Sequence, residues 1–406
     1  MSRVDILNAI AENRSAVRDH FSLSAAPLNP QSAFYLQTNA AAVDGPRELF
    51  ENVGALLGSE PPFDQFRDGE IHYSNSPTSG GMLRLSHAAR WLFAQSRVRP
   101  AEEALRDLED FVKRNHATCL EVMPLWGLNP EEKVDLQIPE GIQLIPISAL
   151  PPSQPTDELT DVNRFTRTYE PSLRLRPAPT VALVRKFNWG PIFIPKEKEI
   201  GGPDYSELMR ELALCLTLLD RTAVSPVAHW FQLDPPPPVI SPIGGAGGYA
   251  LEWTFQSRTP PKAYDVTRTV TLIRCYLALG SRRASLFVPL SRLNAAIKTV
   301  DTRARALDLG IGLEALLLEP KTSPKKRTLA AKGAAWLGGS SNERAVNETK
   351  LRKLYELRSQ VAHEGILPDQ VEWEKNSTPT ENALGEGIDM LVNIIEKVVL
   401  SGAFPK

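Results

Sequence analysis

Two residues near the end of the chain have side chains suited to phosphate chemistry. Arg358 and His363 lie five positions apart in the segment Arg358-Ser-Gln-Val-Ala-His363. A guanidinium binds phosphate oxygens with a planar, permanently charged set of donors. An imidazole, whose pKa lies near neutrality, can take up and release a proton. The pair therefore offers a phosphate clamp close to a proton-transfer group.

Arg358 falls on the apolar face of a predicted helix over residues 350–363. At about 100° per residue, Arg358 lies near the centre of the apolar stripe. This predicted stripe consists of Leu351, Leu354, Tyr355, Val361 and Ala362. A buried guanidinium without a partner is costly, so Arg358 needs a carboxylate, a phosphate or an opening in the core.

Glu314 has the same unusual position on a second predicted helix, 303–318. It lies at the middle of the stripe formed by Leu307, Ile311, Leu317 and Leu318. The simplest account is that Glu314 and Arg358 meet between packed helices as a charge-assisted pair. Such a pair could be structural alone or part of a functional site.

His363 is not brought to Arg358 by helix geometry. It ends the predicted helix just before Gly365, at the negative end of the helix dipole, which favours the imidazolium. Five residues correspond to about 140° around an α-helix. Convergence on one point would therefore need a bent or frayed helix end, long side-chain reach or a second subunit.

The elements that carry these residues belong to a helical C-terminal region. After Pro260-Pro261 the periodicity predicts only helices with short connections, and we expect an all-α bundle over 261–406. The predicted helices are 265–279, 291–299, 303–318, 323–337, 350–363 and 385–400.

Residues 1–260 are predicted to form an α+β region. Helical signals dominate 1–117, as in the segment 100–113, and strand composition dominates 118–260. Apolar runs at 120–125 and 142–147 predict strands, and 180–187 and 191–195 predict a strand pair around the turn Asn188-Trp-Gly.

Composition indicates an ordinary globular protein of two or three domains. The chain has 406 residues, of which 42% are hydrophobic and 23% charged. No apolar run approaches the roughly 18 residues that cross a bilayer, and Asp5 and Glu12 interrupt any N-terminal signal sequence, so we expect a cytoplasmic protein that does not enter membranes. The three cysteines form no CxxC pair, and neither a metal nor a cofactor is predicted.

The charge is unevenly distributed although the formal net charge is only −2. Residues 321–363 carry ten Lys and Arg against three Glu, whereas 364–406 carry eight acids against three Lys. This uneven distribution could indicate a surface that binds nucleic acid, but solvated helix faces would explain it equally well.

The C-terminal region resembles the HEPN ribonucleases, and the Apea-like HEPN group in particular. The resemblance covers about residues 264–400 and includes the Arg358-to-His363 motif and the glutamate helix in the same order. Its further motifs are Ser291-Arg-Leu-Asn, Ala306-Leu-Asp-Leu-Gly-Ile-Gly-Leu-Glu-Ala-Leu-Leu-Leu and Ala330-Ala-Lys-Gly-Ala-Ala. One difference is that Glu364 stands directly after the histidine, where the family usually has glycine.

The resemblance implies a homodimeric helical domain that cuts RNA without metal, as in toxin–antitoxin and anti-phage systems. His363 would be the general base or acid, Arg358 the phosphate clamp, Glu314 the group that orients Arg358, and Ser359 a hydrogen-bonding helper. Backbone affinity for RNA would come from basic side chains on the predicted helices 323–337 and 350–363. These are Lys350, Arg352, Lys353 and Arg327.

Residues 1–260 would then be a sensing or inhibitory region, with a regulatory protein as a possible partner. Two other functions remain open. The domain could keep the fold as a non-catalytic RNA-binding or protein-interaction module, which Glu364 would suit. An N-terminal enzyme has less support, because no histidine there has metal-ligand spacing and no Gly-x-Ser-x-Gly motif occurs.

Overall fold

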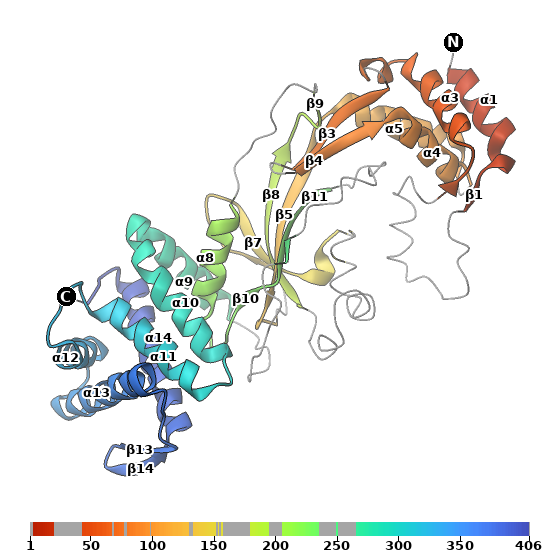
Figure 1. The fold of residues 1–406 in the computed structure, drawn as a ribbon. Coiled ribbons are helices and arrows are strands. Elements are labelled where there is room, and N and C mark those ends of the chain that lie inside the picture. Colours follow the sequence, from red (N-terminus) through yellow and green to blue (C-terminus); the bar gives the residue numbers. More distant parts are fainter. Residues whose placement is uncertain are drawn as a thin grey trace.

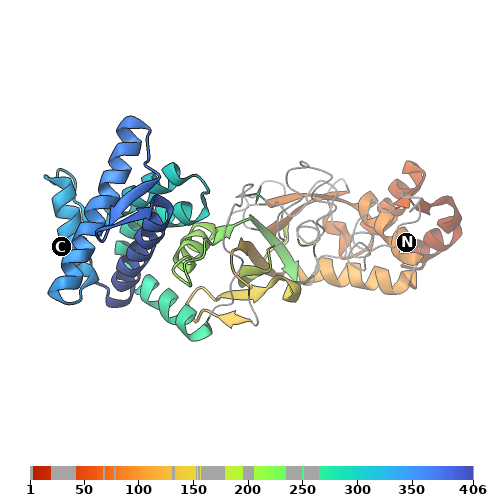
Figure 2. The same cartoon turned by 90° about the horizontal axis from the view of Figure 1, so that it is seen from below.

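The computed structural model describes most of the chain, and Figures 1 and 2 show an elongated molecule with the two ends of the chain at opposite ends. The described residues are 3–19, 43–66, 69–76, 79–97, 99–129, 133–151, 153, 156, 179–194, 205–234, 249–250 and 265–405. They are mixed α+β in the N-terminal half and mainly helical in the C-terminal part. Among them, no helix is long and apolar enough to span a membrane.

Helices gather at the N-terminal end of the molecule (Figure 1). They are α1 (Arg3–Asn13), α3 (Arg47–Gly58), α4 (Leu85–Ser96) and α5 (Ala101–Arg114). Helix α5 confirms the prediction from its apolar spacing. Helical signals dominate the sequence of residues 1–117, but the structure also has strands there. β3 (Glu70–Ser76) and β4 (Ser79–Arg84) form a hairpin, and β1 (Arg18–Asp19) pairs with β2 (Val43–Asp44).

A seven-stranded antiparallel sheet occupies the middle of the molecule, as the strand composition of this region predicts. Its order is β12-β11-β5-β8-β7-β6, and β10 also pairs with β5. The strands are β5 (Ala117–Trp126), β6 (Val134–Asp135), β7 (Ile142–Pro146), β8 (Val181–Trp189), β10 (Ser225–Pro226), β11 (Ala228–Asp234) and β12 (Tyr249–Ala250).

The predicted strand pair around Asn188-Trp-Gly is wrong. Strand β9 (Phe193–Ile194) leaves β8 and pairs instead with β3 in a separate three-stranded sheet. Asn115 holds it there, since its side-chain oxygen accepts from the Phe193 amide at 2.6 Å and its carbonyl accepts from the Ile192 amide at 2.9 Å. Both contacts come from the end of α5, which is distant in sequence from the turn. The sequence around the turn therefore could not predict them.

A buried charged group separates two apolar cores along the central strands. Glu121 on β5 contacts Arg185 Nη2 on β8 at 2.7 Å and His229 Nε2 on β11 at 3.1 Å. Neighbouring Cys119 belongs to the N-terminal core and Met123 to the core shared with the C-terminal helices. Because alternate residues of a strand share a face, Glu121 lies between the two cores.

The C-terminal part contains all six helices that the sequence predicts. They are α9 (Val266–Ala278), α10 (Ala284–Lys298), α11 (Thr302–Leu317), α12 (Lys325–Leu337), α13 (Ser341–Glu364) and α14 (Thr380–Ser401). Three of them, α10, α13 and α14, begin five or more residues earlier than predicted. The region is not purely helical, because β13 (Gln370–Trp373) and β14 (Asn376–Pro379) form a hairpin between α13 and α14.

Helix α8 (Ser206–Leu216) joins the sheet to the bundle. It packs against α9 and α10, and one apolar core runs from the sheet through α8 into the C-terminal helices. Asn294 of α10 is buried at this junction and donates hydrogen bonds to Thr217 Oγ1 at 2.8 Å and to the Val224 carbonyl at 2.7 Å. The predicted division near residue 260 thus marks a change from mixed α+β structure to mainly helical structure, but it does not separate the cores. Residues 251–264 lie outside the described residues.

Candidate functional site

Helix α13 carries most of the predicted site, and its first residues fix where it begins. Ser340 caps it, because the serine hydroxyl accepts from the Glu343 amide and the Glu343 carboxylate accepts from the Ser340 amide at 2.7 Å. These hydrogen bonds lower the pKa of Glu343. Helix α13 therefore begins nine residues before the predicted start at Lys350. The Ser340-x-x-Glu343 pattern is the sequence signal of such a cap.

The structure brings Arg358 and Glu314 together, as the two apolar stripes predict. Arg358 Nε lies 3.2 Å from Glu314 Oε1, between α13 and α11. Both atoms are buried, and neither makes a hydrogen bond among the described residues, so the contact is an ion pair. The Arg358 side chain as a whole is 24% exposed, so part of it remains accessible to a ligand.

Gly310 provides the space in which Arg358 lies. A Cβ atom at Gly310 would be only 2.3 Å from Arg358 Cγ and 2.6 Å from Arg358 Cβ. The aliphatic part of Arg358 therefore lies directly on the backbone of α11, and this close approach positions the guanidinium beside Glu314 one turn further along α11.

The apolar stripes themselves differ from the prediction. On α13 the buried residues are Leu351, Leu354, Leu357 and Val361, whereas Ala362 is exposed and Tyr355 half-buried. On α11, Leu307, Ile311 and Leu318 are half-buried, and the fully buried face lies beside them. Helix α13 packs against three other helices, so its buried arc is wider than one stripe and includes Leu357.

His363 does not converge on Arg358 within one chain. It is exposed in the last turn of α13, and no partner for it exists among the described residues. A bent or frayed helix end, one of the alternatives that could bring the two residues together, is absent, because α13 stays helical through Glu364 and ends only where Gly365 adopts φ 68°. The two side chains therefore leave the helix in directions about 140° apart. Ser359, next to Arg358, is half-buried.

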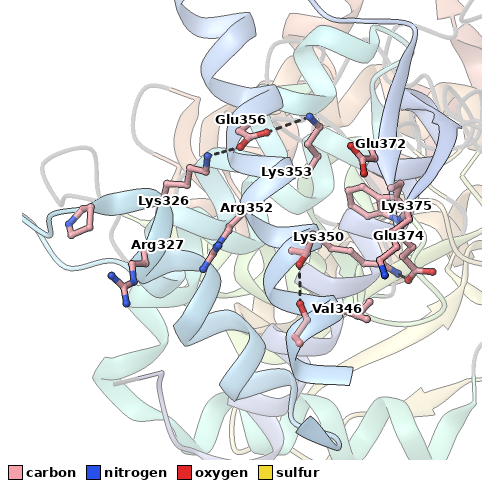
Figure 3. A pocket seen from close by; sticks show the side chains of 14 residues that line it. Lys326, Arg327, Val346, Lys350, Arg352, Lys353, Glu356, Glu372, Glu374 and Lys375 are labelled. Carbon is pink, nitrogen blue, oxygen red and sulfur yellow. Dashed lines mark hydrogen bonds and ion pairs between the residues drawn. The ribbon is translucent and has the colours of Figure 1, made fainter. Parts of the chain in front are cut away.

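All four predicted RNA contacts line one open groove of about 1100 Å³ (Figure 3). The groove lies between the start of α12, the exposed face of α13 and the β13–β14 hairpin. Its charged lining residues are six cations and three acids. They are Lys326, Arg327, Lys350, Arg352, Lys353, Lys375, Glu356, Glu372 and Glu374.

Several of these cations already have carboxylate partners. Glu356 binds Lys326 through one oxygen and lies 3.3 Å from Lys353 Nζ through the other, and Arg352 pairs with Glu348 one turn earlier. Burial alone would raise the pKa of Glu356, but hydrogen bonds from the two lysines and their charges outweigh it and lower the pKa. In contrast, Arg327 is exposed and has no ion pair within the described part of the chain.

Lys350 has an internal role that the sequence did not predict. It pairs with Glu374 of the hairpin and lies 2.7 Å from Glu386 of α14, and its side chain is only 15% exposed. Burial opposes its charge, but the hydrogen bonds and charges of these two carboxylates raise its pKa. Trp373 Nε1 donates to the same Glu386 carboxylate at 2.9 Å. Lys350 therefore holds the hairpin against α13 and α14.

The hairpin and its contribution to the groove were missed from the sequence. Val371 and Trp373 are buried while Glu372 and Glu374 between and after them are exposed, and this alternation is the signal of a strand. Four residues are too few for that signal to stand out. The hairpin brings Lys375 to the groove.

The N-terminal histidines do not gather into a site. His229 contacts buried Glu121, burial and the charges of Arg84 and Arg90 lower the pKa of His87, and His20 lies outside the described residues. Within the described ranges, no three His, Cys, Asp or Glu side chains are arranged to hold a metal ion. Cys119 and Cys215 are buried and Cys275 is half-buried, and burial raises the pKa of Cys119 to about 12.

The comparisons with known proteins identify no relative. No protein-family model matches the chain, and neither a curated protein nor a solved structure matches it at a significant level.

Proposed function

We propose that this protein is a HEPN-type endoribonuclease that cuts RNA without a metal ion. The observation that carries the proposal is the setting of Arg358, whose buried Nε faces Glu314 while about a quarter of its side chain stays exposed, on the helix that also presents His363. A guanidinium held by a carboxylate is oriented for a phosphate. RNA supplies its own nucleophile in the 2′-hydroxyl, so the protein needs only to move protons and stabilise charge.

In this mechanism His363 takes the proton from the 2′-hydroxyl as its oxygen bonds to the adjacent phosphorus. The bond from phosphorus to the 5′-oxygen breaks, and an imidazolium returns a proton to that leaving oxygen. Arg358 stabilises the negative charge of the phosphorane, Glu314 keeps the guanidinium oriented, and Ser359 donates a hydrogen bond. The products are a 2′,3′-cyclic phosphate and a 5′-hydroxyl.

The proposed enzyme is a homodimer, because one chain does not aim Arg358 and His363 at one phosphate. A second copy can supply the missing group at a shared cleft. The face of α11 that carries Glu314 suits such a contact, since Leu307, Ile311 and Leu318 are only half-buried there.

The proposed cellular role is that of a toxin or an anti-phage effector in the cytoplasm. Residues 1–260 would sense a signal or restrain the nuclease, with or without a regulatory protein. The continuous core through α8 supports a sensing role for residues 1–260 and a catalytic role for the helical bundle. A change in the sheet region can reach the bundle through packed side chains.

The test is cleavage of RNA by the purified full chain in EDTA. We expect cyclic-phosphate ends, and we expect His363→Ala and Arg358→Ala to lose at least about a hundredfold in rate, as is common for a lost acid–base group. Gln360→Ala, an exposed position on the same turn, is the matched control. Cleavage that needs added metal, or that survives His363→Ala, would overturn the proposal.

A second candidate is a non-catalytic RNA-binding or protein-interaction module. The observation that favours it is Glu364, an exposed carboxylate directly beside His363 that would oppose an approaching phosphate. This function predicts that RNA is retained but not cut. Arg358→Ala would then lower stability without a change in any cleavage activity, and Glu364→Gly would not create one.

A further inference from the structure

The two walls of the groove present cations that are free to bind a ligand. In Figure 3, Arg327 at the start of α12 lies on one side of α13 and Lys375 at the hairpin tip on the other. Both side chains are exposed, and neither makes an ion pair among the residues that the structure describes. Glu374 and Lys375 form the hairpin turn with φ of 52° and 66°, a conformation that is uncommon outside glycine. The Lys350–Glu374 pair helps to hold this turn.

The floor of the groove leads along α13 to His363. Arg352, Glu356, Ser359 and His363 follow one another at four-, three- and four-residue spacing, so they lie in a line on one face of the helix. Eleven residues separate Arg352 from His363, which corresponds to about 16 Å along the axis. A strand bound in the groove at Arg352 is thus directed toward the proposed acid–base residue.

Glu356 stands on this line between the groove and His363. Lys326 from α12 and Lys353 from α13 both contact its carboxylate (Figure 3). One carboxylate between two lysines from different helices is the arrangement that a phosphate group would also satisfy. When no ligand is present, Glu356 pairs with both lysines and keeps them in place, and its single charge offsets only one of their two.

We propose that this groove holds a single strand of RNA by its phosphates and that Glu356 competes with the strand for Lys326 and Lys353. Arg327 and Lys375 contact the phosphates first, from opposite walls, because they have no carboxylate to give up. Lys350 serves the hairpin and does not bind RNA. The inference rests on the proposed function in that the bound strand continues to His363.

The dimensions favour one strand over a duplex. A volume of about 1100 Å³ is close to that of a pocket for a small ligand. Recognition of double-stranded RNA instead spans on the order of 16 base pairs. The lining also contains apolar side chains, among them Ala345, Val346 and Trp373, and Val346 is 41% exposed there. Such a surface accommodates sugars and bases, whereas an acidic peptide would gain nothing from it.

The test measures binding separately from cleavage. The full chain is titrated with a fluorescent 2′-O-methyl RNA strand, which lacks the nucleophile and cannot be cut, at several salt concentrations. We expect Arg327→Ala/Lys375→Ala to weaken binding roughly tenfold. We also expect the slope of log K against log salt to fall by about 1.4, because each single-strand phosphate contact contributes about 0.7.

Glu356→Gln should have the opposite effect, since it releases two lysines for the strand. We expect at least about threefold tighter binding and a steeper salt slope. The control for lost surface charge is Arg47→Ala/Arg274→Ala, two exposed arginines outside the groove. Thermal melts of every variant identify any that fail to fold.

The possible results separate this inference from the proposed function. Groove variants that bind like the control, a Glu356→Gln protein without gained affinity, or tighter binding of a duplex or an acidic peptide would overturn the groove assignment. If the groove assignment fails but RNA cleavage in EDTA still depends on His363, the proposed nuclease function stands without the groove. Binding of RNA with the expected salt slopes, but no cleavage by the unmodified chain, would support RNA binding in the groove and contradict the proposed nuclease function.

Discussion

Gly310 determines how closely the Arg358 side chain can approach α11. A methyl group at this position would overlap Arg358 Cβ and Cγ, so Gly310→Ala must move the arginine or separate the two helices. We expect a loss of stability of about 1–3 kcal/mol from overpacking. RNA cleavage should fall together with it, by roughly tenfold or more, because a misplaced clamp costs rate even when the fold is kept.

Gly385 is the matched control for this substitution. It is also a helical glycine, in α14, but a Cβ there meets nothing within 4 Å. Gly385→Ala should therefore stabilise the protein by up to about 1 kcal/mol through helix propensity, without a change in cleavage. The measurements are urea denaturation and cleavage rate in EDTA. Cleavage by Gly310→Ala at the rate of the unmodified protein would show that the position of Arg358 is not critical.

Single residues were predicted best where a charge contradicted its apolar surroundings. The unexpected positions of Glu314 and Arg358 on apolar stripes predicted their ion pair, and the structure confirms it. Periodicity could not predict that Ala362 is exposed and Leu357 buried, since it does not say which side of a helix meets which neighbour. It also could not show that Lys350 is neutralised by Glu374 and Glu386, which come from later elements.

The β13–β14 hairpin depends on a cluster of charges that responds to acid. Burial would raise the pKa of Glu386, but hydrogen bonds from Lys350 and Trp373 and the lysine charge lower it. A carboxyl group whose pKa is lowered in the folded state stabilises that state above its unfolded pKa of about 4.3, and this contribution is lost as pH falls further. The hairpin should therefore loosen below about pH 4.

Lys350→Met isolates this contribution. We expect the stability difference between the unmodified protein and this variant to be largest above about pH 5 and to shrink as pH falls below about 4. Amide hydrogen exchange in residues 370–379 measures the hairpin itself. Lys397→Met is the control, because Lys397 donates to the Trp336 carbonyl and not to a carboxylate. A difference that stays constant from pH 7 to pH 3 would contradict the charge-cluster explanation.

At the level of elements, local signals predicted the helices well and the strand partners poorly. The C-terminal helices follow from apolar spacing and caps, and the early start of α13 has its own signal in Ser340 and Glu343. The partner of β9 was wrong because it is chosen by Asn115 and β3, which are far away in sequence. Pairing between distant strands depends on tertiary contacts that no short pattern contains.

The molecule as a whole is less divided than its sequence suggests. The change from strands to helices near residue 260 predicts two regions, yet one apolar core includes Met209 of α8 and Leu293 of α10. Ion pairs reinforce the junction, as between Arg283 and Glu211 at 2.9 Å and between Arg221 and Asp389 at 2.7 Å. Composition and periodicity cannot reveal such a junction, because its apolar residues show the same sequence pattern as any other buried helix or strand face.

At the scale of the whole molecule, the geometry of α13 makes the proposed activity depend on whether two chains share each active site. If Arg358 of one copy and His363 of the other form each site, a mixed dimer of Arg358→Ala and His363→Ala chains has one site in which both groups are intact. The two variants, inactive alone, should then recover cleavage when they are co-expressed with different tags and the mixed dimer is purified. One intact site of two gives about half the activity per dimer, because independent sites add.

The mixed-dimer experiment needs two controls. Homodimers of each variant, purified in the same way, should stay inactive, and a mixed dimer of tagged but unmodified chains sets full activity. No recovery in a stable mixed dimer would mean that both groups of a site come from one chain, or that all four are needed at one cleft. A chain that is active as a monomer would exclude the shared site altogether. The unbroken helix from Arg358 to Glu364 predicts recovery, because it keeps the two side chains of one chain apart.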